Sequence, residues 1–264
     1  MVVQVRDGPP GAVLSYAQLL SIQVGGSLGG QLRAAYLHGS AVLGGWMPGR
    51  SDVDMLFVTG NAVSGRAVEA VAAVLAASGP GCPGSGLECS VVTAGQAGSP
   101  HAPWPFLLHA RPGPGDARQR VVRGDELPGD PDLLMHYAVC RAAGWPVYGP
   151  GPRELIGSVA RRAILGYLAG ELRWGAEHGT EAYAVLNACR ALVFLADGQI
   201  VSKVAGGSIA LARGLGPPAL IGRALDQQHG MSPEQAVTPD ATDYILAAAA
   251  ALRSAADAGA GSIT

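Results

Sequence analysis

The residue pattern of this chain changes at Gly149-Pro150-Gly151-Pro152, and no other feature constrains the fold as much. Before this point, short apolar runs alternate with helical stretches and with many glycines and prolines; after it, apolar residues recur at helical spacing nearly to the end. Alternating runs are typical of a sheet layered with helices, and the second pattern is typical of a helix bundle. The sequence therefore predicts two domains, an α/β domain at 1–150 and an all-α domain at 151–264.

Local patterns place the elements of both domains. In the first we expect strands at Ala34–Leu37, Val53–Val58, Leu87–Thr93 and Arg118–Val122, a helix at Ser64–Ala77, and loops through Gly98–Gly115. In the second we expect helices at Ile156–Leu172, Ala182–Leu195 and Ala219–Gln228, one that begins at Ser202, and a last one at Asp240–Ala258. No internal repeat is present.

Composition excludes several classes of protein. The 264 residues include 18 basic and 20 acidic side chains without a basic stripe, which disfavours a nucleic acid as the main ligand. Four widely spaced cysteines without a CxxC pattern predict reduced thiols rather than a zinc site or disulfides. The start lacks a secretory signal, and the apolar tract Ile245–Leu252 is too short to cross a bilayer. We therefore expect a cytoplasmic protein without a membrane partner; the oligomeric state stays open.

The stretch from Tyr36 to Asp54 carries the strongest chemical signal. An apolar run ends at Gly39-Ser40, where a glycine permits close approach of a phosphate and a serine caps a helix whose free N–H groups favour an anion. After a ten-residue connection, Ser51 precedes Asp52 and Asp54, whose carboxylates project from one face of a strand. Two such carboxylates repel each other unless a cation lies between them, and their oxygens suit Mg²⁺ bound together with nucleotide phosphates.

A third carboxylate, Glu88, lies within the apolar strand that follows. A charge in such a strand needs a partner, and a metal ion or a substrate hydroxyl would supply one. Glu88 would then complete a two-metal site and accept the proton of an attacking hydroxyl. Each part has a structural alternative: Asp-x-Asp is common in turns, and a lone strand glutamate often faces water. The joint order of strand, Gly-Ser, connector, Ser-Asp-x-Asp and acidic strand favours catalysis.

With these residues the chain resembles the nucleotidyltransferase superfamily, whose signature is a hydrophobic strand, Gly-Ser and an Asp-x-Asp pair. It is most similar to the aminoglycoside adenylyltransferases of the streptomycin/spectinomycin type, in the metal-site segment LHGSAVLGGWMPGRSDVDMLFV, the base strand Gly86–Val92, the interdomain helix Asp130–Pro150 and the helical core Tyr183–Ala210. The resemblance covers most of the chain. It implies a nucleotidyltransferase domain with a mixed sheet, followed by a helical bundle that closes on substrate and nucleotide.

The resemblance also implies roles for individual residues. Gly39, Ser40 and Ser51 would bind the nucleotide, and Asp52, Asp54 and Glu88 would hold two Mg²⁺ ions, with Glu88 as the base. Lys203 matches a lysine that reaches the triphosphate, and Arg190 an arginine that helps to hold the closed state. Cations near a triphosphate stabilise its charge. The alternatives are an ion pair between helices for Arg190 and a solvent-exposed position for Lys203.

The acceptor site departs from the family pattern. We expect it around Trp174, Glu177, Thr180, Glu181 and Tyr183. Where antibiotic-modifying members have an acidic residue the chain has Thr180, and where they have an asparagine it has Tyr183. The tryptophan that follows their base strand has no counterpart in 107–118. Polycationic drugs need acidic surroundings, so the acceptor specificity stays open although the transfer chemistry looks intact.

Four histidines and four tryptophans have less definite roles. His38 lies beside the Gly-Ser pair, where it either touches phosphate or packs in the core. His101, His109 and His136 lack metal-ligand spacing. Trp46, Trp104, Trp145 and Trp174 are expected to be packing anchors, although Trp174 lies near the expected cleft.

The sequence thus predicts transfer of AMP from ATP to a hydroxyl of a small acceptor, such as an aminoglycoside-type antibiotic, with release of pyrophosphate. Two alternatives remain at this point. The acceptor is a nucleoside, a sugar, a tRNA end or a protein hydroxyl, or the protein binds nucleotide without turnover. Three acidic residues at the expected places argue against the second alternative, because a protein that only binds has no need of a base.

Overall fold

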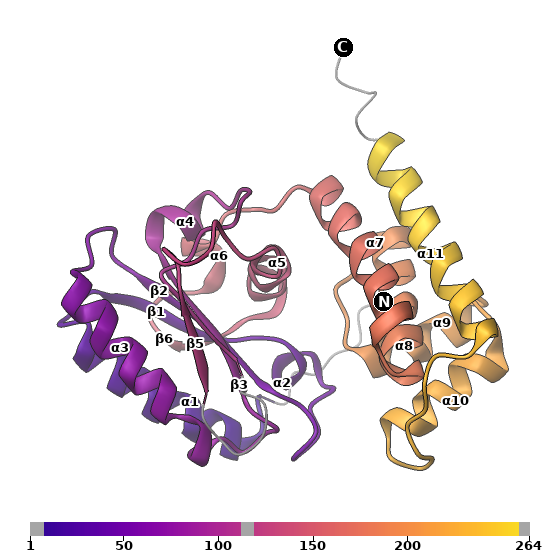
Figure 1. The fold of residues 1–264 in the computed structure, drawn as a ribbon, viewed down its shortest axis with the longest axis horizontal. Helices are drawn as coiled ribbons and strands as arrows, with labels where there is room; N and C mark the ends of the chain where they lie inside the picture. Colours follow the sequence, from indigo (N-terminus) through magenta and orange to yellow (C-terminus); the bar gives the residue numbers. More distant parts are fainter. Residues whose placement is uncertain (1–7, 112–118, 259–264) are drawn as a thin grey trace. The chain divides into compact units, whose positions relative to one another are not determined.

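Among the residues that the structure describes, six strands form one mixed sheet in the first part of the chain (Figure 1). The computed structural model describes residues 8–111 and 119–258. The strands are β1 (Leu32–Leu37), β2 (Val53–Thr59), β3 (Leu87–Thr93), β4 (Leu108–Arg111), β5 (Arg120–Arg123) and β6 (Trp145–Tyr148), in the order β5-β4-β3-β2-β1-β6. Of these described strands, β2 and β3 are the one parallel pair, and the other neighbours are antiparallel. The expected strand Leu87–Thr93 is confirmed as β3. The expected strands Ala34–Leu37 and Val53–Val58 are confirmed as parts of β1 and β2.

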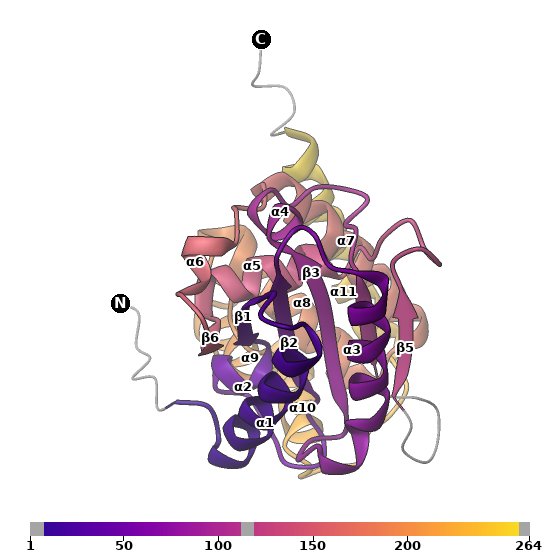
Figure 2. The same ribbon diagram turned by 90° about the vertical axis from the view of Figure 1, so that its left-hand side faces the viewer.

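Helices cover both faces of the sheet. On one face lie α1 (Gly11–Ser27) and α3 (Gly65–Ala77), which stand in front of the strands in Figure 2. On the other lie α4 (Ala94–Gly98), α5 (Leu133–Ala143) and α6 (Pro152–Leu155). Alternate residues of β2 explain this layering, because Met55 and Phe57 join the first core and Leu56 and Val58 the second. Helix α3 begins after Ser64, whose side chain accepts a hydrogen bond from Ala67 N, as expected.

Helix α1 and strand β4 differ from the sequence-based expectations for the sheet domain. Helix α1 was not predicted, because apolar residues surround the helix and give no amphipathic period; Leu19 and Ile22 are exposed. The expected loop region Gly98–Gly115 contains the strand β4. Residues 112–115 of that region lie outside the described residues. Arg118, the first residue of the expected strand Arg118–Val122, also lies outside them.

The stretch Asp130–Pro150 is not one helix. It forms α5 and then, after Gly144, the edge strand β6. A side chain at Gly144 would meet the backbone of Cys140, which helps to explain the turn there. Pro146 cannot donate a ladder hydrogen bond, so an edge strand is the place where a sheet accommodates it.

Within residues 160–258 the second part of the chain forms five helices: α7 (Arg161–His178), α8 (Glu181–Asp197), α9 (Lys203–Arg213), α10 (Pro218–Gln228) and α11 (Pro239–Ala258). Helix α8 is the most buried, with Ala184, Val185 and Ala188 fully enclosed. Helix α9 begins after Ser202, whose hydroxyl accepts a hydrogen bond from Ala205 N. The expected helical bundle is therefore present, and the helix expected to begin at Ser202 starts there, with Ser202 as its cap.

The chain divides by its contacts into unit 1 (Met1–Val159) and unit 2 (Ala160–Thr264). Residues 151–159 therefore lie with the sheet. Ile156 is buried in the core beside α5, and Gly157 N donates to Ala97 O in α4. The expected helix Ile156–Leu172 consequently starts later, at Arg161, because its first residues are held by the sheet domain. None of the described helices has the length and apolar character that crossing a membrane requires.

Candidate active site

The Gly-Ser turn joins β1 to the short helix α2 (Ser40–Leu43), directly beside the second aspartate of the motif. Gly39 has φ 62° and ψ −145°, a conformation that side chains with a Cβ avoid. A Cβ at this position would lie 1.9 Å from Asp54 Oδ2. The carboxylate therefore rests against the backbone of the turn, and only glycine permits both the conformation and the contact.

Asp54 and Glu88 are neighbours across the only parallel strand pair of the described sheet. They are in register, in the second position of β2 and of β3. Strand neighbours lie about 4.8 Å apart, so the two side chains leave the sheet side by side. Leu56 lies two residues after Asp54, and Val92 lies four residues after Glu88, so each shares a face of the sheet with that carboxylate. Both Leu56 and Val92 belong to the core under α5. Both carboxylates therefore project on the α5 face.

Asp52 precedes β2 and has the same parity as Asp54. Its Oδ1 accepts a hydrogen bond of 2.8 Å from Ser85 Oγ, in the loop before β3. Ser51 Oγ accepts a hydrogen bond from Met47 N at 3.0 Å and closes the turn that leads into the motif. The loops that precede β2 and β3 thus hold Asp52 in place.

The electrostatics of Glu88 indicate a site for a cation. Burial raises its pKa to about 7; His109 opposes this rise, and Asp52, Asp132 and Asp130 add to it. These acids repel one another, and a divalent cation with a preference for oxygen ligands would relieve the repulsion. The residues present therefore fit Mg²⁺. Within 8–111 and 119–258, however, no three His, Cys, Asp or Glu side chains are already arranged to hold a metal ion.

Three histidines lie around Glu88. His136 Nε2 in α5 is 3.6 Å from Glu88 Oε1, and the ring of His38 lies 4.8 Å from that of His136, centroid to centroid. His109 Nδ1 in β4 is 3.0 Å from Ser90 Oγ and 3.5 Å from Asp130 Oδ2. Burial lowers the pKa of each histidine. His38 is only 2% exposed, which favours the core role over phosphate contact.

Sequence reasoning missed this histidine group because its members come from three separate elements. Only the pairing of Ser90 with His109 across β3 and β4, and the packing of α5 on the same face, bring them to Glu88. No spacing along the chain signals such an arrangement.

The predicted nucleotide residues of unit 2 lie on α8 and α9. Lys203 Nζ is 5.1 Å from the centroid of the Tyr183 ring. Arg190 lies where α9 packs closely on α8, since a Cβ at Gly206 would come within 2.9 Å of the Arg190 Cα. Both cations have further interactions within the structure. Their predicted triphosphate role stays a prediction.

Most of the predicted acceptor residues form an aromatic surface group on α7 and α8. Trp174 is 50% exposed, stacks on His178 with 5.3 Å between ring centroids, and meets Tyr183 edge-on at 6.2 Å. Glu177 is exposed beside His178. Thr180 caps α8, with its hydroxyl accepting from Tyr183 N. The structure brings these residues together.

Glu181 lies apart from this group, because its side chain is fully buried. Its carboxylate accepts hydrogen bonds from Arg223, Gln227, Gln235 and Thr238, all of unit 2. An acidic residue engaged in this way has no free oxygen lone pair to offer an amine of a ligand. We therefore leave Glu181 out of the proposed acceptor site, contrary to the expectation from the sequence.

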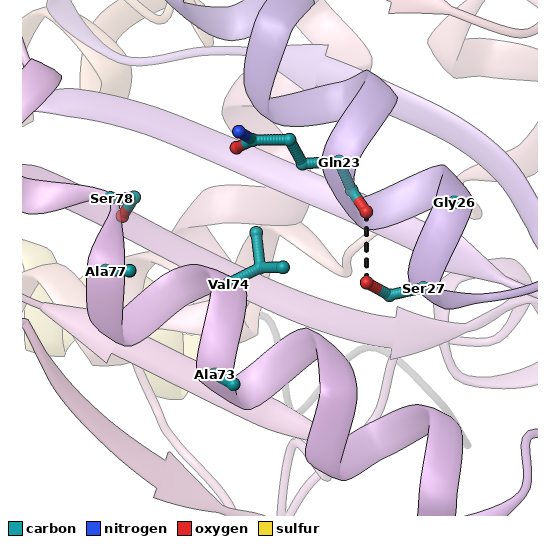
Figure 3. A pocket seen from close by; sticks show the side chains of 7 residues that line it. All are labelled: Gln23, Gly26, Ser27, Ala73, Val74, Ala77 and Ser78. Carbon is teal, nitrogen blue, oxygen red and sulfur yellow. Dashed lines mark hydrogen bonds between the residues drawn. The ribbon is translucent and has the colours of Figure 1, made fainter.

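A cavity of about 610 Å³ opens between α1 and α3 (Figure 3). Small residues line it, among them Gly26, Ala73 and Ala77, and Ser27 Oγ donates to Gln23 O at its edge. It lies on the α1–α3 face of the sheet, whereas Glu88 points to the α5 face. This cavity is therefore separate from the carboxylate site.

Comparison with known proteins extends these observations. Residues 158–251 match the family model of the aminoglycoside adenylyltransferase C-terminal domain. The structure is similar to spectinomycin adenyltransferase AAD(9) from Enterococcus faecialis, solved with ATP and spectinomycin, with a TM-score of 0.62 and 16% identity over 90% of this chain and 99% of that chain. No curated protein sequence matches.

The comparisons confirm the predicted resemblance to the aminoglycoside adenylyltransferases, in sequence over residues 158–251 and in fold over 90% of the chain. The predicted fold class, a mixed sheet followed by helices, is confirmed as well.

Proposed function

We propose that the protein transfers AMP from ATP to a hydroxyl group of a small aminoglycoside-type acceptor and releases pyrophosphate. The observation that carries the proposal is the register of β2 with β3, which sets Glu88 beside Asp54 while Asp54 rests on the Gly39 turn. A carboxylate pair beside a turn of bare backbone suits a site for a metal-bound phosphate chain. The family match of residues 158–251 supports an acceptor of the antibiotic class.

Each residue of the carboxylate group has a proposed role. Asp52 and Asp54, with Glu88, would hold Mg²⁺, which supplies charge neutralisation on the phosphates when it is bound. Glu88 accepts the proton of the acceptor hydroxyl as the oxygen forms its bond to the α-phosphorus. The bond between the α-phosphorus and the oxygen of pyrophosphate breaks, and pyrophosphate leaves with the electron pair. The products are an AMP ester of the acceptor, pyrophosphate and a proton on Glu88.

The burial of Glu88 suits the proton transfer. A base works best when its pKa lies near the working pH, and burial raises the pKa of Glu88 to about 7. A fully solvated glutamate, with a pKa near 4.3, would be a much weaker base.

The residues that we assign to the acceptor match the family pattern less well than the carboxylates do. Trp174, Glu177, Thr180 and Tyr183 form the surface of unit 2 that we assign to the acceptor, with Glu177 as its acidic member. An exposed indole offers a flat apolar face for the rings of a sugar or cyclitol. Glu177 attracts the amino groups that such acceptors carry.

The direct test is an assay of Mg²⁺-dependent pyrophosphate release from ATP with a panel that contains spectinomycin, streptomycin and other aminoglycosides. We expect release with at least one of them, and a mass gain of one adenylyl group on that acceptor. Asp54→Asn should lower the rate on the order of 1,000-fold, because a metal ion contributes several kcal/mol of transition-state stabilisation. The exposed Asp125→Asn is the matched control and should leave the rate unchanged.

Other outcomes have clear meanings. Full activity of Asp54→Asn would refute the assignment of the site. Modification of a nucleoside, a sugar, a tRNA end or a protein hydroxyl, but of no aminoglycoside, would refute the acceptor class and keep the chemistry. Binding of Mg²⁺·ATP by calorimetry without turnover on any acceptor would refute the enzymatic proposal.

A further inference from the structure

The first turn of α5 is fixed relative to β3 by a chain of polar contacts. Ser90, two residues after Glu88 on the same face, contacts His109 at 3.0 Å, and His109 contacts Asp130 at 3.5 Å. Asp130 Oδ1 in turn accepts a hydrogen bond of 3.0 Å from Asp132 N, directly before α5. The start of this helix is therefore held by the strand that carries the proposed base.

This arrangement places His136, the fourth residue of α5, opposite Glu88. Its Nε2 lies 3.6 Å from Glu88 Oε1, and its side chain is only 13% exposed. The ring packs on that of the buried His38 at 4.8 Å, with a tilt of 45°. Packing of this kind restricts rotation of the ring, so Nε2 stays directed at the carboxylate.

The two nitrogens of His136 have different surroundings. Nδ1 is buried and has no hydrogen-bond partner among the described residues. A buried N–H without an acceptor is costly, and the carboxylate beside Nε2 is an acceptor. The neutral tautomer with its proton on Nε2 therefore suits this environment best, and it directs a donor at Glu88.

We propose that His136 is the positioning residue of the base: its Nε2–H holds one oxygen of the Glu88 carboxylate and leaves the other oxygen to accept the proton of the acceptor hydroxyl. The inference rests on the proposed function. A base that is itself oriented by a third group is a recurrent arrangement in enzymes. The separation of 3.6 Å is longer than a hydrogen bond, and such contacts commonly shorten when substrates bind.

Three variants of His136 separate positioning from packing. The side-chain amide of glutamine reaches the place of Nε2, that of asparagine reaches only the place of Nδ1, and leucine keeps the bulk without a donor. We expect His136→Leu and His136→Asn to lower kcat about 10- to 100-fold, because a misplaced catalytic group has an effect of that order. His136→Gln should keep kcat within about fivefold of the original.

The KM for ATP should change less than about twofold in all three variants, because the proposed role concerns the base and not nucleotide binding. His101→Leu, a change of an exposed histidine in the same unit, is the matched control and should leave kcat unchanged. Thermal melting of each variant checks that the fold is kept.

The results decide whether His136 positions Glu88 or only packs in the core. Equal kcat for the leucine and glutamine variants would overturn the inference, and so would a loss of kcat that follows only the loss of thermal stability across the series. Absence of turnover in the unchanged protein with every acceptor tested would overturn the proposed function and this inference with it. Turnover in the unchanged protein and in His136→Leu alike would overturn the inference alone.

Discussion

Removal of the buried carboxylate of Glu181 should destabilise unit 2 strongly. The carboxylate accepts from Arg223 Nε at 2.7 Å, Gln235 Nε2 at 2.8 Å, Thr238 Oγ1 at 2.6 Å and Gln227 Nε2 at 3.3 Å. These donors lie on α10 and on the chain that leads into α11, so one side chain of α8 joins three segments.

The size of the effect follows from what the donors lose. Loss of one partner from a buried ion pair costs about 3–5 kcal/mol, because the other partner stays desolvated. The Arg223 side chain is 40% exposed and regains some water, so the lower end applies. We therefore expect Glu181→Ala to lower the free energy of unfolding by about 3 kcal/mol, and Glu181→Gln by about 2 kcal/mol, since glutamine keeps one acceptor oxygen.

The same contacts predict a dependence on pH. Burial alone would raise the pKa of Glu181, but hydrogen bonds from Arg223, Thr238 and Gln235 outweigh it and lower the pKa from 4.5 to about 2. Because the folded pKa lies below the unfolded one, the stabilisation is complete above about pH 4.5 and is lost as the pH falls toward 2. A difference of this size corresponds to about 3 kcal/mol.

Urea unfolding of the full chain, followed by far-ultraviolet circular dichroism at pH 7 and pH 3, measures both effects. Hydrogen exchange of α8 and α10 peptides assigns the change to unit 2. We expect the gap between the unchanged protein and Glu181→Ala to be about 3 kcal/mol at pH 7 and clearly smaller at pH 3. Glu177→Ala, at an exposed position four residues earlier, should shift the free energy by less than about 0.5 kcal/mol. A Glu181→Ala variant within 1 kcal/mol of the unchanged protein at pH 7 would contradict the reasoning.

Two further predictions concern the carboxylate site. Gly39→Ala should lower kcat/KM about 100-fold, because the new Cβ displaces Asp54. Gly49 has a similar positive φ but open space around it, so Gly49→Ala should lose about 1 kcal/mol of stability and keep its activity. Equal activities of the two variants in steady-state assays would refute this prediction. Ser85→Ala should raise the Mg²⁺ concentration for half-maximal activity about 10-fold, because Asp52 loses its hydrogen bond; an unchanged Mg²⁺ titration would show that this bond is unimportant.

Local patterns predicted much of the fold. Val53–Val58 and Leu87–Thr93 are short apolar runs bounded by loops, and such runs identify strands without any tertiary information. The starts of α3 and α9 were signalled by Ser64 and Ser202, whose side chains accept hydrogen bonds from the first turns of these helices. Helix α1 was missed because it lacks an amphipathic period.

The candidate site was predicted only as far as one local motif reaches. Gly39, Ser40, Asp52 and Asp54 lie within one strand-turn-strand segment, so their neighbourhood follows from the sequence. The pairing of Asp54 with Glu88 depends on the register of two strands, and register depends on the buried faces of both.

The sequence by itself determined which chemical groups the protein carries and which short segments present them, because capping, strand alternation and turn geometry act over a few residues. Only the tertiary structure decided that His136 faces Glu88, and that Glu181 is enclosed by donors from α10 and the chain before α11. Contacts between distant segments depend on how whole helices and strands pack, and that packing is a property of the assembled core rather than of any local spacing.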